Sequence, residues 1–288
     1  MSRQCYFPKG QIVVYSVNWK RNALPFSFLK RWLSREEQRA CNGKRRHSDR
    51  MRFLWGRVML RALTPTWIRT ASRQLAIDKE EKGKPFLTNA AVEFNLSHAG
   101  DWVSLALSSS PVGIDIEVVQ KRTYWTQIAH RYFSENEVEW LFSTPEEAEQ
   151  LQRFAQIWTQ KEAYVKATGV GLMQALSEYE TRELSLTEPW RTWVTSQQEK
   201  TPWFARTFQL SPKMQACVVS GSMKQLRTYS INAFTLKYRH LGWRKKSGFH
   251  RSGNSPPVRS RITLKVAQGQ SSRGNALTHT SLGSAVRA

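Results

Sequence analysis

Apolar residues recur every three or four positions in two long stretches of the chain, and this spacing predicts helices. The first stretch, SREEQRACNGKRRHSDRMRFLWGRVMLRAL (34–63), predicts one amphipathic helix that ends before Pro65. Its large apolar side chains are Met51, Leu54, Trp55, Val58, Met59 and Leu63. The second stretch, LQRFAQIWTQKEAYVKATG (151–169), predicts a helix that stops at Gly169, because glycine favours the position after a helix C-terminus.

A shorter helix is predicted within RYFSENEVEWLF (131–142). Ser134 precedes Glu137 by three residues, which is the spacing of a capping box in which each side chain satisfies a backbone N–H group. We therefore interpret Glu137 as a structural residue.

Alternating apolar and polar residues predict strands between and after these helices. VEFNLSH (92–98) and WVSLALS (102–108) are separated by only three residues and predict a hairpin. PVGIDIEVV (111–119) predicts a strand, and QACVVS (215–220) and SINAFTL (230–236) are later strand-like runs. The order helix, strands, helices, strands indicates an α+β or α/β fold, with a break between two halves near residue 111.

The C-terminal segment 236–288 differs from the rest of the chain. It contains four lysines and seven arginines but no acidic residue, so it carries 11 of the net charge of +22. It is rich in serine and glycine and lacks helical or strand periodicity, which predicts disorder. Such a tail could bind RNA or an anionic membrane, or it could be an appended segment without a selected role.

Composition narrows the class of protein. A chain of 288 residues can bury a substantial core as one large domain or two of ordinary size. Cys5, Cys41 and Cys217 lack the spacing of a disulfide framework or a zinc site. No apolar run is long enough to cross a membrane and no signal peptide is evident, so we expect an unexported, cytoplasmic protein. The basic charge suggests a nucleic-acid partner, but the sequence contains no recognisable module for one.

Two carboxylates on the predicted strand 111–119 are candidates for chemistry. Asp115 and Glu117 are two positions apart, so they leave the strand on one face, about 7 Å apart at their Cα atoms. A hard cation such as Mg²⁺, held together with substrate phosphates, would relieve their repulsion. The alternative is that both lie on a solvated face of the sheet.

The predicted helix 151–169 presents a second charged set. Trp158, Glu162 and Lys166 are four residues apart and project from one side of the helix. An exposed Glu–Lys pair would contribute only about 0.3–0.5 kcal/mol, which does not explain charges that share a face with a tryptophan. Ser97 and His98 end a strand where side chains can reach a cleft, whereas Lys84 by itself is an ordinary surface lysine.

In this order, KGKPFL, FNLSHAGDW, VGIDIE and WTQKEAYVK resemble the signature of the Sfp-type 4'-phosphopantetheinyl transferases. The similarity spans residues 53–171 and extends more weakly from the N-terminus to about residue 235. It implies an α+β fold of two similar halves, 1–111 and 112–235, related by a pseudo-twofold axis. Coenzyme A would bind between the halves, and the basic tail 236–288 would lie outside this fold.

The resemblance also implies an activity. Such enzymes transfer the phosphopantetheine arm of coenzyme A to a serine of an apo acyl or peptidyl carrier protein and release adenosine 3',5'-bisphosphate. The implied Mg²⁺ ligands are Asp115, Glu117 and Glu162, the implied coenzyme contacts are Arg39, Lys84, Ser97 and His98, and the implied catalytic residues are Glu162 and Lys166. Lys166 would hold the pyrophosphate, and Glu162 or a water it orients would take the serine proton.

Two alternatives remain open at this point. One is a nucleic-acid-binding protein that uses the basic tail, and the other is a transferase domain that has lost activity and serves as a scaffold. The intact set of carboxylates argues against the second. We expect a monomer with no membrane partner, and the sequence leaves open which carrier and pathway it serves.

Overall fold

The computed structural model describes residues 7–231, apart from 69–70, 72–73, 82, 170–175, 184–190, 196–202 and 222–224. The helices are α1 (Phe26–Lys30), α2 (Arg35–Asn42), α3 (His47–Leu63), α4 (Trp125–Tyr132), α5 (Glu135–Phe142) and α6 (Glu147–Thr168), with 3₁₀ turns η1 (Thr64–Thr66) and η3 (Leu176–Glu178). The strands are β1 (Gln11–Asn18), β2 (Ile77–Lys79), β3 (Pro85–Leu87), β4 (Glu93–Ala99), β5 (Trp102–Ser108), β6 (Val112–Val118), β7 (Tyr179–Glu183), β8 (Arg191–Thr195), β9 (Phe204–Ser211), β10 (Met214–Ser220) and β11 (Gln225–Ser230). The predicted tail 236–288 lies outside the described residues.

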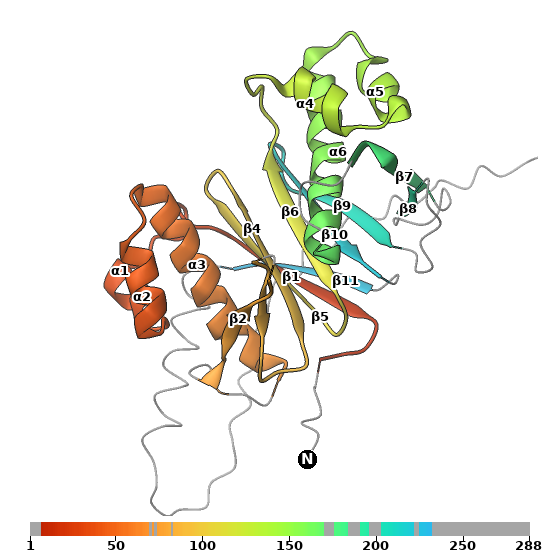
Figure 1. The fold of residues 1–288 in the computed structure, drawn as a ribbon. Helices are drawn as coiled ribbons and strands as arrows, with labels where there is room; N and C mark the ends of the chain where they lie inside the picture. The colour runs from red at the N-terminus through yellow and green to blue at the C-terminus, as the bar shows by residue number, and fades with distance from the viewer. Residues whose placement is uncertain are drawn as a thin grey trace, which may run out of the picture.

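The first half is a four-stranded sheet covered by α3, with strand order β11-β1-β5-β4 (Figure 1). Alternate residues of β1 and β5 face α3, as the period of two in a strand requires. These residues are Val13, Tyr15, Val17, Val103, Leu105 and Leu107, and they join the buried apolar side chains of α3 in one cluster. β11 returns from the far end of the described chain and pairs with β1 in parallel.

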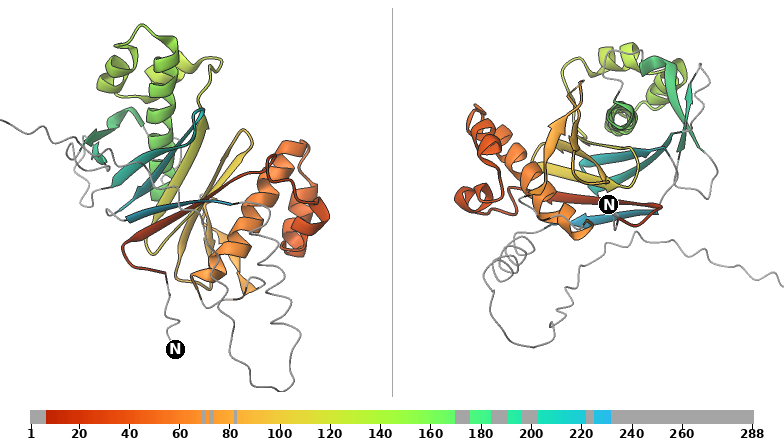
Figure 2. Two further views of the ribbon diagram at one scale, coloured as in Figure 1. Left: turned by 180° about the vertical axis from the view of Figure 1, so that it is seen from behind. Right: turned by 60° about the horizontal axis from the view of Figure 1, so that its bottom comes forward.

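The second half is a five-stranded sheet with the order β6-β10-β9-β8-β7. The long helix α6 lies against β6 and β10 on one face of it, and Figure 2 (right) views this helix nearly along its axis. α4 and α5 pack on the N-terminal part of α6 through an aromatic cluster that includes Trp125, Phe133 and Phe154. The α+β fold of two sheet-and-helix halves predicted from the sequence is therefore confirmed.

The predicted helix 34–63 is two helices rather than one. α2 ends at Asn42, and Arg46 is in an extended conformation before α3 begins. The linking residues GKRR (43–46) contain no apolar side chain to bury and three adjacent positive charges, so packing does not support a continuous helix there. α2 has its own capping box, formed by Ser34 and Glu37. The predicted helix end before Pro65 is confirmed, because α3 ends at Leu63.

The other local predictions are largely confirmed. β4 and β5 form the expected hairpin, with Gly100 at φ 52° in its turn. Ser134 and Glu137 cap α5 reciprocally, and Gly169 ends α6 in the left-handed conformation at φ 72°. α6 begins four residues earlier than predicted, at Glu147. Of the predicted strand 230–236, only Ser230 and Ile231 are described, and β11 ends at Ser230.

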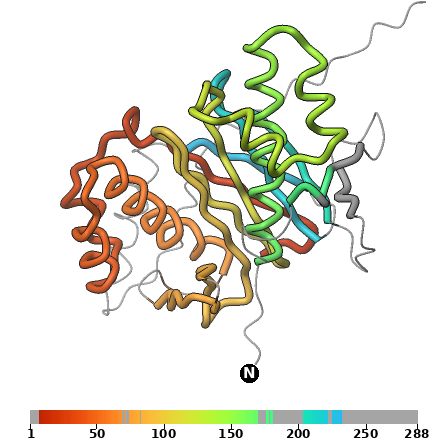
Figure 3. Tube along the Cα trace, turned by 45° about the horizontal axis from the view of Figure 1, so that its top comes forward, coloured from red at the N-terminus to blue at the C-terminus, as the bar shows by residue number. Residues whose placement is uncertain are grey.

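The two sheets meet where β4 and β6 lie side by side (Figure 3). β4 is an edge strand of the first sheet and β6 an edge strand of the second. Apolar residues from both sheets, including Ile12, Ala106 and Ile114, share one buried cluster. Among the described helices, none is long and apolar enough to cross a membrane.

Candidate active site

Residues from three of the sequence motifs converge where the two halves meet. Asp115 on β6 is only 4% exposed, and its Oδ1 accepts hydrogen bonds from Lys166 Nζ on α6 at 2.6 Å and from Ser97 Oγ on β4 at 2.9 Å. Lys166 Nζ also lies 3.3 Å from Ser97 Oγ. The alternative of a solvated sheet face is therefore wrong for Asp115, because α6 covers that face of β6.

A glycine on β6 makes this convergence possible. A Cβ atom at Gly113 would clash with the backbone oxygen of Ala163 and would lie 2.5 Å from the backbone nitrogen of Ala167. Only a residue without a side chain lets α6 approach β6 so closely. The approach brings Lys166 within hydrogen-bonding distance of Asp115.

Two further carboxylates stand beside Asp115 with raised pKa values. Burial raises the pKa of Glu117 to about 7, and the charge of Asp115 adds to this effect, although Glu117 forms an ion pair with Arg122. Burial also raises the pKa of Glu162, with Lys166 lowering it and Asp115 raising it. Burial is the main cause of both shifts, so each carboxyl group holds a proton more readily here than it would in water.

The chemistry of these donors fits a shared Mg²⁺ ion. Asp115 Oδ2 is buried and has no hydrogen-bond partner, so one carboxylate oxygen remains available to a ligand. Within the described ranges, no three acidic, histidine or cysteine side chains are close enough to hold a metal ion by themselves. A Mg²⁺ ion here would need further ligands, and Mg²⁺ commonly takes one or two carboxylates and completes its shell with water and substrate phosphates.

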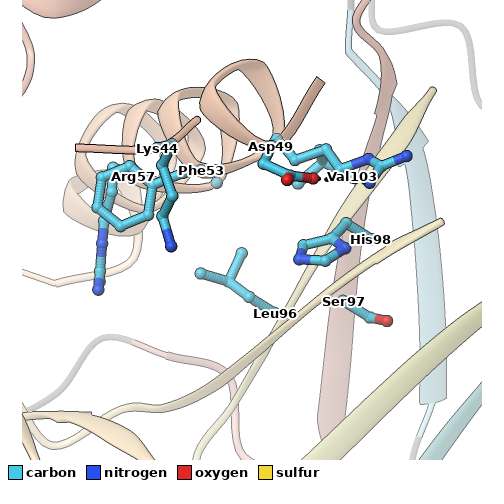
Figure 4. A pocket seen from close by; sticks show the side chains of 10 residues that line it. Lys44, Asp49, Phe53, Arg57, Leu96, Ser97, His98 and Val103 are labelled. Atoms are coloured by element: carbon cyan, nitrogen blue, oxygen red, sulfur yellow. Dashed lines mark hydrogen bonds and ion pairs between the residues drawn. The ribbon is translucent and has the colours of Figure 1, made fainter. Parts of the chain in front are cut away.

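A cavity of about 370 Å³ opens next to Ser97 (Figure 4). Its walls come from the α2–α3 loop and α3 on one side and from the β4–β5 hairpin on the other. The lining residues are Lys44, Asp49, Arg52, Phe53, Gly56, Arg57, Leu96, Ser97, His98 and Val103. Three cationic side chains and one aspartate give the cavity a net positive charge, which suits an anionic ligand.

Two of the three cations of the cavity, Arg52 and Arg57, are held in place by neighbouring groups. Arg52 Nε donates to the backbone oxygen of Gly100 at 2.9 Å. Arg57 lies 3.7 Å from Glu37 Oε1, and its guanidinium carbon is 5.4 Å from the centre of the Phe53 ring. Because their positions are already constrained, these side chains lose less conformational entropy when they bind an anion.

His98 stands at the exposed side of this cavity. Desolvation lowers its pKa, a hydrogen bond to its own backbone opposes this, and the charges of Arg52 and Lys166 lower the pKa further. At neutral pH the imidazole is therefore predominantly uncharged and acts as a hydrogen-bonding group.

Two predicted coenzyme contacts lie outside this cavity. Lys84 Nζ donates to the backbone oxygen of Ala167 at 3.0 Å and so satisfies a carbonyl in the last turn of α6. Burial lowers the pKa of Lys84, while Glu80 and Glu93 raise it. Arg39 is exposed on α2 and is not among the residues that line the cavity.

Sequence reasoning missed several residues of the site. Arg52 and Arg57 lie between the apolar positions of α3, where arginine is ordinary on the polar face of an amphipathic helix, so the spacing did not mark them. Lys44 and Arg122 lie in loops, where sequence spacing gives no signal. Lys161, beside Glu162 in the same motif, is not part of the site: it is fully buried and donates to the carbonyl oxygens of Leu176 at 2.7 Å and Tyr179 at 2.5 Å.

Comparisons with known proteins agree with this geometry. Residues 111–219 match the 4'-phosphopantetheinyl transferase superfamily, and residues 17–110 match the N-terminal region of 4'-phosphopantetheinyl transferases. The 4'-phosphopantetheinyl transferase psf-1 of Bacillus pumilus is 34% identical over 191 residues, which are 66% of this chain and 79% of that protein. The transferase ffp of Bacillus subtilis is 32% identical over 192 residues, covering 66% of this chain and 83% of that protein.

Two other similarities are lower. The transferase Sfp of Bacillus subtilis strain 168 is 29% identical over 189 residues, which are 65% of this chain and 82% of that protein. A crystal structure of Thermotoga maritima holo-[acyl-carrier-protein] synthase (AcpS) covers 41% of this chain and 64% of that chain at 20% identity. Its TM-score of 0.30 is too low to support a conclusion.

The two family matches together cover both halves of the α+β fold and the residues of the site between them. The chain belongs to the 4'-phosphopantetheinyl transferase family of the Sfp type. It is a 4'-phosphopantetheinyl transferase that acts on carrier proteins.

Proposed function

We propose that the protein transfers the 4'-phosphopantetheine arm of coenzyme A to a serine of an apo acyl or peptidyl carrier protein, in a Mg²⁺-dependent reaction that releases adenosine 3',5'-bisphosphate. One observation carries the proposal. Asp115, Lys166 and Ser97 form a connected cluster directly beside a cavity lined by cations. Coenzyme A has the matching chemistry, with a phosphorylated nucleoside at one end joined through a pyrophosphate to the arm.

The cavity is the proposed place for the nucleotide end of coenzyme A. Lys44, Arg52 and Arg57 would neutralise its phosphate oxygens, and a guanidinium can bind two oxygens of one phosphate at once. His98, predominantly neutral at pH 7, would donate or accept a single hydrogen bond. Ser97 lines the cavity and also bonds Asp115, so it would connect the nucleotide to the reacting pyrophosphate.

The carboxylates are the proposed ligands of Mg²⁺. Asp115, Glu117 and Glu162 are not close enough to hold the ion by themselves, so they would share it with substrate phosphates and water. The buried Oδ2 of Asp115, which has no hydrogen-bond partner, is the first candidate ligand atom. When bound, Mg²⁺ supplies positive charge against the pyrophosphate oxygens. Lys166 would bind a pyrophosphate oxygen with the same ammonium group that now contacts Asp115 and Ser97.

Glu162 is the proposed proton acceptor. The pKa of Glu162 is raised towards pH 7, and a general base is most effective when its pKa lies near the pH of the reaction. The serine hydroxyl would give its proton to Glu162 as its oxygen forms a bond to the attacked phosphorus. The bond from that phosphorus to the bridging oxygen of the pyrophosphate breaks, and adenosine 3',5'-bisphosphate leaves with that oxygen.

Mass spectrometry of candidate carriers tests this function. The protein is incubated with coenzyme A, Mg²⁺ and apo acyl or peptidyl carriers, and we expect the carrier to gain the mass of one phosphopantetheine arm. A carrier with its acceptor serine changed to alanine is the control and should stay unmodified. Absence of the added mass on every carrier tested would contradict the proposal.

Several narrower expectations remain predictions. They are the boundary of the halves at residue 111, their pseudo-twofold relation, the monomeric state, the cytoplasmic location and a coenzyme contact for Arg39 and Lys84. The nucleic-acid alternative depends mainly on the basic tail, which lies outside the described residues.

A further inference from the structure

The two edge strands at the junction of the halves are joined by side chains rather than by a backbone ladder. β4 ends one sheet and β6 ends the other, and across the described residues these strands belong to separate sheets. An edge strand leaves backbone N–H groups without a neighbouring strand, and such groups need other partners when they are buried.

Two residues of β4 supply these partners. The side-chain Oδ1 of Asn95 accepts a hydrogen bond from Ile114 N at 2.9 Å, and Ser97 Oγ accepts one from Ile116 N at 3.2 Å. Asn95 and Ser97 are two positions apart on β4, and Ile114 and Ile116 are two positions apart on β6. Both side chains therefore leave β4 on one face and reach N–H groups on one edge of β6.

The two bonds lie on either side of Asp115. Ile114 precedes Asp115 and Ile116 follows it, so the backbone of β6 is held at both neighbours of the carboxylate. Asn95 and Ser97 are each 5% exposed, which means that water has little access to replace either hydrogen bond. The peptide groups beside Asp115 are consequently fixed relative to β4, which also carries His98.

We propose that Asn95 is a positioning residue for the transfer reaction, which rests on the function proposed above. Because Asn95 holds Ile114 N, it fixes the position of Asp115 relative to Ser97 and Lys166 and to the cavity in the first half. Asn95 does not line the cavity, so its effect on the reaction passes through β6. Ser97 performs the same function at Ile116 in addition to its contacts with Asp115 and Lys166.

Three variants test this role. Asn95→Ala removes the acceptor of Ile114 N, whereas Asn95→Ser keeps a hydroxyl acceptor of the kind that Ser97 already uses on this strand. Ser16→Ala is the matched control, because it removes the buried hydroxyl pair between Ser16 and Ser104 at 2.7 Å in the same sheet but leaves the acceptor of Ile114 N in place. For each variant we would measure melting temperature, the kcat and KM of carrier modification, and hydrogen exchange of the Ile114 amide.

We expect Asn95→Ala to lower kcat by about 10- to 100-fold, as loss of an outer partner of a metal ligand commonly does. The KM for the carrier should be unchanged, and the Ile114 amide should exchange faster. Asn95→Ser should fall between this variant and the wild type in both kcat and exchange. Ser16→Ala should lower the melting temperature but leave kcat and Ile114 exchange as in the wild type.

Two results would overturn the proposal. One is an Asn95→Ala protein that is folded and has a kcat within about twofold of the wild type. The other is a loss of kcat that follows the loss of melting temperature equally in Asn95→Ala and Ser16→Ala. If the wild type modifies a carrier and either result is found, only the role of Asn95 is contradicted. If the wild type modifies no carrier, the proposed function is contradicted as well.

Discussion

Asp115 has one oxygen bound within the protein and one without a partner, and this difference predicts how it responds to substitution. Asp115→Asn keeps the shape of the side chain and an oxygen for Ser97 but removes the negative charge. We expect the variant to fold and to need more Mg²⁺ for transfer, with the rate partly restored at high Mg²⁺. The measurement is the transfer rate against Mg²⁺ concentration, with circular dichroism to confirm the fold.

Glu162→Gln is the matched comparison for this prediction. If Glu162 accepts the serine proton, the amide cannot replace it, and the rate should stay lower by about 10²–10⁴-fold at saturating Mg²⁺. Equal rescue of both variants would remove the base role of Glu162 but leave its metal role. Near-normal transfer by both folded variants would contradict the site.

The raised pKa of Glu117 implies that the stability of the metal-free protein depends on pH. This pKa is raised to about 7, so between pH 4.5 and 7 the folded state holds a proton that the unfolded state has lost. Stability should therefore decrease as the pH rises through this range, by up to about 3 kcal/mol. Denaturant unfolding at pH 5.5 and 7.5 with a chelator measures this change, and Glu117→Gln should reduce it. An equal pH dependence in the variant would show that other groups cause it.

The sequence allowed some of these residues to be predicted as a group and others not. Asp115, Ser97 and Lys166 belong to motifs, and the structure brings them together. Lys161 belongs to the same motif as Lys166 but is buried on another side of α6, where it pairs with Glu137 at 2.8 Å. Lys161 contacts Glu137 and Lys166 contacts Asp115 only because of how other elements pack on α6, so the spacing within the motif could not separate their roles.

At the scale of elements, the contact of α6 with β6 depends on Gly113. Gly113→Ala should destabilise the protein by at least about 1–3 kcal/mol, because the added methyl group meets helix backbone that cannot move aside locally. It should also reduce transfer, because a displaced α6 separates Lys166 from Asp115. Chemical denaturation together with the transfer assay checks both effects.

Gly43→Ala is the control for this substitution. Gly43 has a negative φ of −68°, and a Cβ atom there would be 3.7 Å from its nearest neighbours. We expect no loss of stability or activity. Similar losses in both variants would contradict the specific role of Gly113.

The ends of helices and strands could be predicted from the sequence where residues close in the chain determine them. The capping box of α5, the glycine that ends α6 and the tight β4–β5 turn all act within a few residues. The break between α2 and α3 was missed because apolar spacing on either side is compatible with one helix. The pairing of β1 with β11 could not be predicted, since it joins segments from opposite ends of the described chain.

For the whole molecule, we expect a chain ending near residue 235 to retain transferase activity. Every matched motif lies before residue 172, and β11 is complete at Ser230. The transfer assay on the shortened protein tests this prediction, with a thermal melt to confirm folding. A folded but inactive shortened protein would contradict it.

The full chain and the shortened protein can also be compared for RNA binding. Equal RNA retention with and without the tail at low salt would argue against nucleic-acid binding by the tail.

The position of β11 also affects the order in which the protein can fold during synthesis. Gln11 pairs with Gln225, so the edge of β1 has no partner until the ribosome has made nearly all of the second half. An exposed strand edge can pair with other chains, which makes an incomplete first half prone to aggregation. The first half is therefore the earlier one to emerge but the later one to be completed, and a nascent chain interrupted before residue 225 would need protection by chaperones.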